Sequence, residues 1–177
     1  YPTIERAGLV LFWYHPRGEA PLWEIPQQDV PAPGFGPYDR ALWRVRCPWQ
    51  EMAENGPDFI HLRTVHGAAD VPELESYELE GFSARLRSRV NFATPRGPQT
   101  GRIDTDSWGP GFSLARFSGI LDACFVSAMT PVDFEWTEVS FNYTFRRGEG
   151  ADAARTARLG AALIADLKRQ EEEDILI

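Results

Sequence analysis

The feature that most constrains the fold of this chain is a series of strand-like segments from residue 82 to residue 146. In residues 82–92, apolar side chains occupy one face and polar side chains the other, with Ser88 as the exception on the apolar face, a pattern typical of an antiparallel strand with one wet side. Short turns rich in glycine and proline imply antiparallel neighbours. Further strands are predicted at 101–108, 111–118, 120–130 and 134–146.

A long helix is predicted over residues 151–174, after the last of these strands. Its buried stripe contains Gly160, Leu163, Ile164 and Leu167. Acidic residues continue this stripe, because positions four and seven beyond Leu167 are Glu171 and Asp174. The apolar run Ile175-Leu176-Ile177 follows at once. Asp174 is therefore expected at the edge of a core, where a carboxylate needs a partner such as a metal.

Two strands are predicted before these elements. Residues 7–15 are expected to form a buried strand, and residues 42–47 alternate as a half-buried strand does. With a short helix between them and the later strands, the pattern predicts about seven antiparallel strands and a long C-terminal helix. This is an α+β layer arrangement.

The short helix, predicted over residues 50–66, holds two of the three histidines of the chain, His61 and His66. At about 100° per residue, Asp58 and His61 share a face, whereas His61 and His66 stand about 140° apart. Both imidazoles can reach one metal only if the helix widens as in a π-type bulge or ends between them. The alternative is two half-buried histidines, each bonded to a backbone carbonyl.

Asn55, Asp58, His61 and His66 form the motif N-x2-D-x2-H-x4-H, which is followed by a glycine. This motif resembles the iron-binding segment of Rieske-type non-haem iron oxygenases, in the catalytic domain of their large (alpha) subunit. The resemblance extends to residues 8–14 and 21–26 before the motif and to the acidic end of the chain. It is closer to the steroid- and sterol-acting branch, such as 3-ketosteroid 9-alpha-hydroxylases and cholesterol desaturases, than to naphthalene-type dioxygenases.

This resemblance implies a helix-grip fold of the START/Bet v 1 type, in which the sheet curls around the long helix and leaves an apolar cavity. Two imidazoles and one carboxylate are the ligand set of non-haem Fe(II) oxygenases. The metal ligands are therefore expected to be His61, His66 and Asp174, with Glu171 or Glu173 as alternatives for the carboxylate.

The other two residues of the motif are expected to serve the iron without binding it. A carboxylate commonly orients a metal-bound histidine through its other ring nitrogen, and Asp58 is assigned that role. In the family, the matching aspartate bridges the iron site to a cluster-binding histidine of a neighbouring subunit. Asn55 is expected to support the site as a polar neighbour.

By the same resemblance, the reaction is hydroxylation, by mono- or dioxygenation, or desaturation of an apolar aromatic or steroid-like substrate with O2. Electrons are expected from NAD(P)H through a flavin reductase, a ferredoxin or both, and then a Rieske [2Fe–2S] cluster, in a homotrimeric protein. A pocket for such a substrate is mostly apolar. Its candidate residues, each of which could instead belong to the core, are Phe59, Ile60, Val65, Phe117 and Phe125.

Composition limits the remaining possibilities. With 177 residues and 43% hydrophobic content, residues 1–177 are expected to form one domain, the mononuclear-iron catalytic domain. The net charge of −8 opposes nucleic-acid binding, and no apolar run approaches the roughly 20 residues of a membrane span. Two distant cysteines favour a reduced, cytoplasmic setting.

The chain is expected to be part of a longer protein. It lacks an initiating methionine, and neither cysteine has a histidine two or three residues after it. The C-x-H … C-x2-H pattern of a Rieske domain is therefore expected upstream or on another polypeptide.

Two other classes of function compete with the oxygenase. One is a metal-free helix-grip module that binds a hydrophobic ligand, which needs neither the two histidines nor the terminal acid. The other is a zinc hydrolase with two histidines and one aspartate, for which Asp58 is the one evident general base. Iron content after anaerobic reconstitution separates the first of these from the oxygenase.

Overall fold

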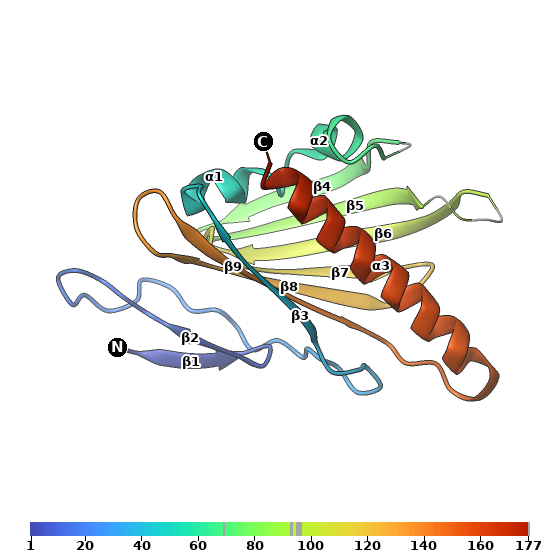
Figure 1. Cartoon of the computed structure of the whole chain (residues 1–177). Helices are drawn as coiled ribbons and strands as arrows, with labels where there is room; N and C mark the ends of the chain where they lie inside the picture. Colours follow the sequence, from blue (N-terminus) through green and yellow to red (C-terminus); the bar gives the residue numbers. More distant parts are fainter. Residues whose placement is uncertain (69, 93, 95–96, 177) are drawn as a thin grey trace.

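A seven-stranded antiparallel sheet organises the computed structural model, which describes residues 1–68, 70–92, 94 and 97–176 (Figure 1). Its strand order is β3-β9-β8-β7-β6-β5-β4, and β1 and β2 form a separate two-stranded sheet. In chain order the elements are β1 (Thr3–Arg6), β2 (Leu9–Phe12), β3 (Asp39–Val45), α1 (Trp49–Glu54), α2 (Phe59–Thr64), β4 (Glu73–Glu80), β5 (Ser83–Phe92), β6 (Gln99–Trp108), β7 (Phe112–Ser118), β8 (Ala123–Pro131), β9 (Thr137–Phe145), a short 3-10 turn (Gly150–Asp152) and α3 (Ala153–Asp174).

The long helix α3 runs diagonally across one face of the sheet, and its C-terminal end lies beside α1 and α2 (Figure 1). Its apolar stripe packs against β9, where Ile164 meets a core that includes Val139, Phe141 and Tyr143. Gly160 is buried as predicted. The predicted fold class, an antiparallel sheet around a long C-terminal helix, is therefore confirmed as helix-grip. None of the helices in the described ranges has the length and apolar character needed to cross a membrane.

The N-terminal segment covers the other face of the sheet. Ala7, Ile25 and Val30 pack there against inward side chains of β7 and β8, such as Leu114 and Val126, which are fully buried. Residues of β9 that alternate away from α3 are consequently buried too. The sheet thus has an apolar cluster on each face. The cavity described below lies on the face that α3 covers.

The predicted buried strand 7–15 is wrong in extent and burial. The strand is β2, four residues long and paired with β1, and its outer side chains Val10 and Phe12 are 74% and 60% exposed. Sequence analysis also missed β4, an almost fully exposed edge strand. A bulge between Leu74 and Ser76 shifts its register and breaks the alternation of apolar residues. The expected total of seven strands holds for the main sheet, but β4 replaces β2 in it.

The predicted helix 50–66 is also wrong, because the segment forms two short helices, α1 and α2. Pro57 disfavours a helical conformation for the residue before it, and Asp58 then starts a new helix as its N-cap. The Asp58 carboxylate accepts hydrogen bonds from the backbone N–H groups of Ile60 at 3.0 Å and His61 at 3.4 Å. Helix α2 ends at Thr64, between the two histidines, which is the second of the two geometries that spacing allowed.

The end of the chain meets the expected apolar packing only in part. Ile175 packs against the core on the α3 side of the sheet, whereas Leu176 is 86% exposed. Ile177 lies outside the described residues. Of the two described residues after α3, Ile175 is thus the one that anchors the last helical turn to the core.

Close contact between α3 and β9 depends on the lack of a side chain at position 160. A Cβ there would lie 2.5 Å from ring carbon Cδ1 of Phe145. We expect Gly160→Ala to destabilise the fold by about 1–2 kcal/mol, because overpacking outweighs the gain of about 1 kcal/mol in helix propensity. Thermal unfolding measures this. Phe145→Leu should relieve the loss in a double mutant, and Ala161→Gly on the exposed face should show the propensity effect alone.

Candidate metal centre

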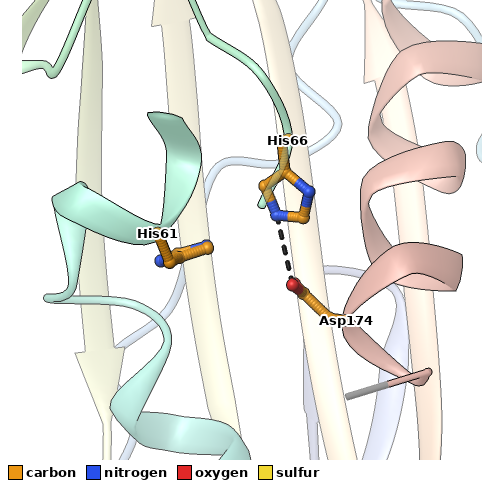
Figure 2. Close-up of side chains that lie close together, drawn as sticks. All are labelled: His61, His66 and Asp174. Carbon is orange, nitrogen blue, oxygen red and sulfur yellow. Dashed lines mark ion pairs between the residues drawn. The ribbon is translucent and has the colours of Figure 1, made fainter. Parts of the chain in front are cut away.

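Three side chains that can bind a metal converge where α2 and the end of α3 meet the sheet. His61 lies on α2, His66 follows that helix, and Asp174 is the last residue of α3 (Figure 2). One ligand atom from each lies within 4.8 Å of the other two. The two imidazole rings are nearly perpendicular, with centroids 5.1 Å apart. The structure thus brings together the three residues that sequence analysis assigned as ligands.

His66 is held between two carboxylates. Its side chain is only 2% exposed, and its Nδ1 lies 2.9 Å from Oε2 of Glu173. Its Nε2 lies 3.2 Å from Oδ1 of Asp174, the contact drawn in Figure 2. Because an ionised carboxylate only accepts hydrogen bonds, Nδ1 of His66 donates its proton to Glu173. This leaves Nε2 as the nitrogen that faces Asp174. A carboxylate behind a histidine in this way fixes the ring and its tautomer.

His61 is oriented by the backbone of its own helix start. Its Nδ1 is hydrogen bonded to the carbonyl oxygen of Asp58, so Nε2 is the free ring nitrogen. The Asp58 carboxylate caps α2, and the residue is exposed. The His61 ring is therefore oriented by the backbone carbonyl of Asp58 and not, as was expected, by its carboxylate, because that carboxylate binds backbone N–H groups of α2. Asn55 is also exposed and lies at the rim of the cavity next to the histidines.

The three acids considered as the carboxylate ligand have different surroundings. Glu173 is the one behind His66, and the hydrogen bonds from His66 and Arg169 hold its pKa below the ordinary value. Burial raises the pKa of Asp174, while the neighbouring His66 and His61 oppose that rise. Glu171 points into the interior one turn earlier, and burial raises its pKa to about 7. Of the three carboxylates, that of Asp174 joins the histidine pair.

A cavity of about 650 Å³ opens beside the three converging residues, between α3 and the sheet. His61, His66 and Asp174 all contribute to its wall. One part of its wall is aromatic, where Phe125 stacks on Tyr143 with ring centroids 5.1 Å apart and contacts Phe141 edge to face. Its size falls in the range of pockets that bind small molecules.

The five apolar residues proposed for the pocket are dispersed. Phe125 lines the cavity, whereas Phe117 is buried in a core cluster with Ala115 and Ala123. Phe59, Ile60 and Val65 are outside the set of described residues that form the wall. Helix α2 turns His61 and Leu62 toward the cavity, so its other side faces out.

Among the polar wall residues, sequence analysis did not single out Tyr143, and it considered Glu171 only as an alternative metal ligand. A signal for both was present. Tyr143 falls on the apolar face of the predicted strand 134–146, and Glu171 continues the apolar stripe of α3. A polar group on an inward face is the pattern that marks such residues.

The donor atoms suit a divalent metal of the first transition series. Two neutral imidazole nitrogens and one carboxylate on one side of a site, with open space on the other, are the 2-His-1-carboxylate arrangement of non-haem iron oxygenases. The hydrogen bond at each Nδ1 leaves both Nε2 atoms available as ligands. Fold and site together define a class: a helix-grip domain with this donor set at the wall of an apolar cavity.

Comparison with known proteins identifies the family. The chain belongs to the 3-ketosteroid 9alpha-hydroxylase C-terminal domain family, whose sequence profile matches residues 12–177. This confirms the resemblance to the steroid-acting branch of the Rieske oxygenases. Over 70 residues the chain is 40% identical to cholesterol 7-desaturase of Caenorhabditis elegans, and over 73 residues 36% identical to the Bombyx mori protein of the same name. These matches cover 39% and 41% of the chain but only 16% of each relative, so the matched segments are a small part of those proteins.

Solved structures agree on the fold. Dicamba monooxygenase bound to dicamba superposes with a TM-score of 0.65 at 14% identity, over 82% of this chain and 49% of that one. Pseudomonas putida CBB5 NdmA with caffeine has a TM-score of 0.66 at 15% identity, over 98% and 50%. A START superfamily protein from Mycobacterium smegmatis has a TM-score of 0.57 at 9% identity, over 79% and 97%. By name, the relatives and the first of these neighbours are oxidoreductases, a desaturase and a monooxygenase.

Glu171 should make the stability of the metal-free chain depend on pH. Because burial raises its pKa from 4.5 to about 7, the folded protein keeps a proton that the unfolded chain releases above about pH 4.5. Its stabilising contribution is complete below pH 4.5 and is lost as the pH rises through 7. The loss is at most about 3.5 kcal/mol, since one pKa unit corresponds to about 1.4 kcal/mol.

Urea unfolding in EDTA between pH 4.5 and 8 measures this effect. Relative to wild type, Glu171→Gln should gain stability as the pH rises, and Glu172→Gln, an exposed neighbour, should not. A constant difference between wild type and Glu171→Gln across that range would contradict the assignment.

Proposed function

We propose that residues 1–177 are the mononuclear-iron catalytic domain of a Rieske non-haem iron oxygenase, with His61, His66 and Asp174 as the Fe(II) ligands. The observation that carries this proposal is the convergence of these three side chains within 4.8 Å at the wall of a 650 Å³ cavity. Membership of the 3-ketosteroid 9alpha-hydroxylase family supports it. So does the similarity in fold to the structure of dicamba monooxygenase with non-haem iron and dicamba.

Bound iron supplies the ability to activate O2, because three protein ligands leave coordination positions open. The chain itself prepares the site. The Asp58 carbonyl and the Glu173 carboxylate hold the two imidazoles by their Nδ1 atoms. Two neutral histidines and one aspartate leave a ferrous site with a net charge near +1. The side chains of Phe125 and Phe141 in the wall would offer apolar contacts to a substrate.

The substrate is proposed to be a steroid-like or aromatic molecule that is hydroxylated or desaturated. The names of the family and of the desaturase relatives support the steroid class. Electrons are proposed to come from NAD(P)H through a flavin reductase, a ferredoxin or both, and then a Rieske [2Fe–2S] cluster on an upstream domain. A homotrimer would place that cluster beside a neighbouring subunit. The Asp58 carboxylate is exposed and accepts a hydrogen bond from the backbone N–H of His61. This position suits a surface where a cluster domain docks.

A metal-free ligand-binding module is the competing function. The similarity to a START superfamily protein over 97% of that protein's length supports it, as does the cavity itself. Such a module has no need for the His66 contacts with Glu173 and Asp174, which bury a histidine among carboxylates. Metal binding therefore decides between the two.

The chain should bind one Fe(II) after anaerobic reconstitution. His66→Ala and Asp174→Ala should each reduce bound iron at least tenfold, because each removes a ligand. Iron per chain after gel filtration measures this. Glu172→Ala and His15→Ala are matched controls, since Glu172 is exposed on the same helical turn and His15 lies in the turn after β2. Equal iron in all five proteins would rule out this site.

Glu173 should tune the metal without binding it. Glu173→Gln weakens the hydrogen bond to Nδ1 of His66, and loss of such an outer partner typically lowers metal affinity about 10- to 100-fold. Competition with a chromophoric chelator, using Co(II) in place of Fe(II), measures the affinity. Glu172→Gln should change it less than twofold. An unchanged affinity in Glu173→Gln would show that His66 needs no carboxylate behind it.

A further inference from the structure

Two polar side chains inside the cavity have no hydrogen-bond partner among the described residues. They are the hydroxyl of Tyr143 and atom Oε1 of Glu171. Both residues are more than nine-tenths buried, with exposures of 2% and 8%, and both line the cavity. A buried polar group without a partner destabilises a fold. Two of them in one cavity therefore indicate a partner that the protein does not itself supply.

Other buried polar groups of the described cavity wall do not share this property. Ser113 and Ser127, also in the cavity wall, hydrogen bond to each other at 2.8 Å across β7 and β8. Asn142 has an unpaired Oδ1, but it alternates to the opposite face of β9 and is not among the cavity residues. Within the described wall, unpaired buried atoms are thus confined to Tyr143 and Glu171.

Both groups are held in place before any ligand arrives. The Tyr143 ring stacks on Phe125 and meets Phe141 nearly at right angles, so its hydroxyl has a fixed position. Glu171 lies on the buried stripe of α3, behind Leu167. The two are close enough to interact electrostatically: burial raises the pKa of Tyr143, and the nearby Glu171 carboxylate raises it further.

We infer that Tyr143 and Glu171 bind an oxygen substituent, a hydroxyl or a carbonyl, on an otherwise apolar ligand. The Tyr143 hydroxyl can donate to either kind of oxygen, and a ligand hydroxyl can in turn donate to Oε1 of Glu171. The aromatic side chains of the wall, Phe125 and Phe141, would contact the apolar carbon skeleton of that ligand. A single ligand oxygen would thus give a partner to each of the two unpaired atoms.

The catalytic consequence of this contact rests on the proposed function. Glu171 lies three residues before Asp174, or about 4.5 Å along the helix. The oxygen would therefore be held near the metal ligands, and not at the far end of the cavity. Tyr143 and Glu171 would act as positioning residues that select which carbon of the ligand faces the metal.

Three matched probes test the inference on the full chain in EDTA: androstane, its 3-ketone and its 3-alcohol. Because no metal is needed, the outcome is independent of iron binding and of turnover. Calorimetric titration should show at least one oxygenated probe binding about tenfold more tightly than the hydrocarbon, the effect of one net hydrogen bond of about 1.4 kcal/mol. A tighter ketone identifies the carbonyl as the preferred group, and a tighter alcohol the hydroxyl.

Variants then locate the contact. Tyr143→Phe should reduce the preference for oxygenated probes to about twofold or less, and Glu171→Leu should reduce it while Glu171→Gln keeps most of it. The infrared carbonyl band of the bound ketone should shift to lower frequency in wild type and return in Tyr143→Phe. Tyr38→Phe is the matched control, because its hydroxyl donates to the carbonyl of Ala7 at 2.8 Å on the other side of the sheet.

Two results would overturn the inference. Equal affinities of the three probes for the wild-type chain would do so without any variant. A uniform change in all three affinities in Tyr143→Phe would show that the pair holds only water. Both results are obtained without metal, so they can be interpreted even if the chain fails to bind iron. The two proposals are therefore tested separately.

Discussion

The site depends on the two contacts that His66 makes with the end of α3. Its Nδ1 meets Glu173 and its Nε2 meets Asp174, which joins segments 107 residues apart in the chain. Helices α1 and α2 have no fully buried residue of their own, so apolar packing alone holds them weakly. The buried imidazole therefore fixes both the local fold and the donor set. A metal at this point would replace a histidine–carboxylate contact that already sets the positions of its ligands.

Acids on the inward face of α3 have an energetic cost that the rest of the helix offsets. Burial disfavours the charged forms of Asp174 and Glu171. Two histidines compensate Asp174, but the described protein offers Glu171 no hydrogen bond for Oε1. Residues upstream, such as Ile164 and Leu167, provide the apolar burial that tolerates this. Polar groups that a core does not need are commonly found at functional sites.

Much of this architecture could be predicted from sequence, because the periodic elements are long. The strand 82–92 and the helix 151–174 repeat their patterns over many residues, and both are present within a few residues of the expected limits. Periodicity failed where another force dominates. A register bulge hides β4, and the Asp58 cap divides what looked like one helix. The convergence of an early histidine with a terminal acid depends on tertiary packing, which spacing alone does not contain; the family motif suggested it.

The pocket could be predicted least, because an inward-facing apolar residue is the same in sequence whether it lines a cavity or fills a core. Phe125 and Phe117 occupy the same face of neighbouring strands, and only the first reaches the cavity. The central claim concerns the position of one ion. Crystals soaked anaerobically with Fe(II) and measured at the iron edge should show one anomalous peak bonded to Nε2 of His61, Nε2 of His66 and an Asp174 oxygen. A peak elsewhere, or none with Asp174 turned away from both rings, would contradict it.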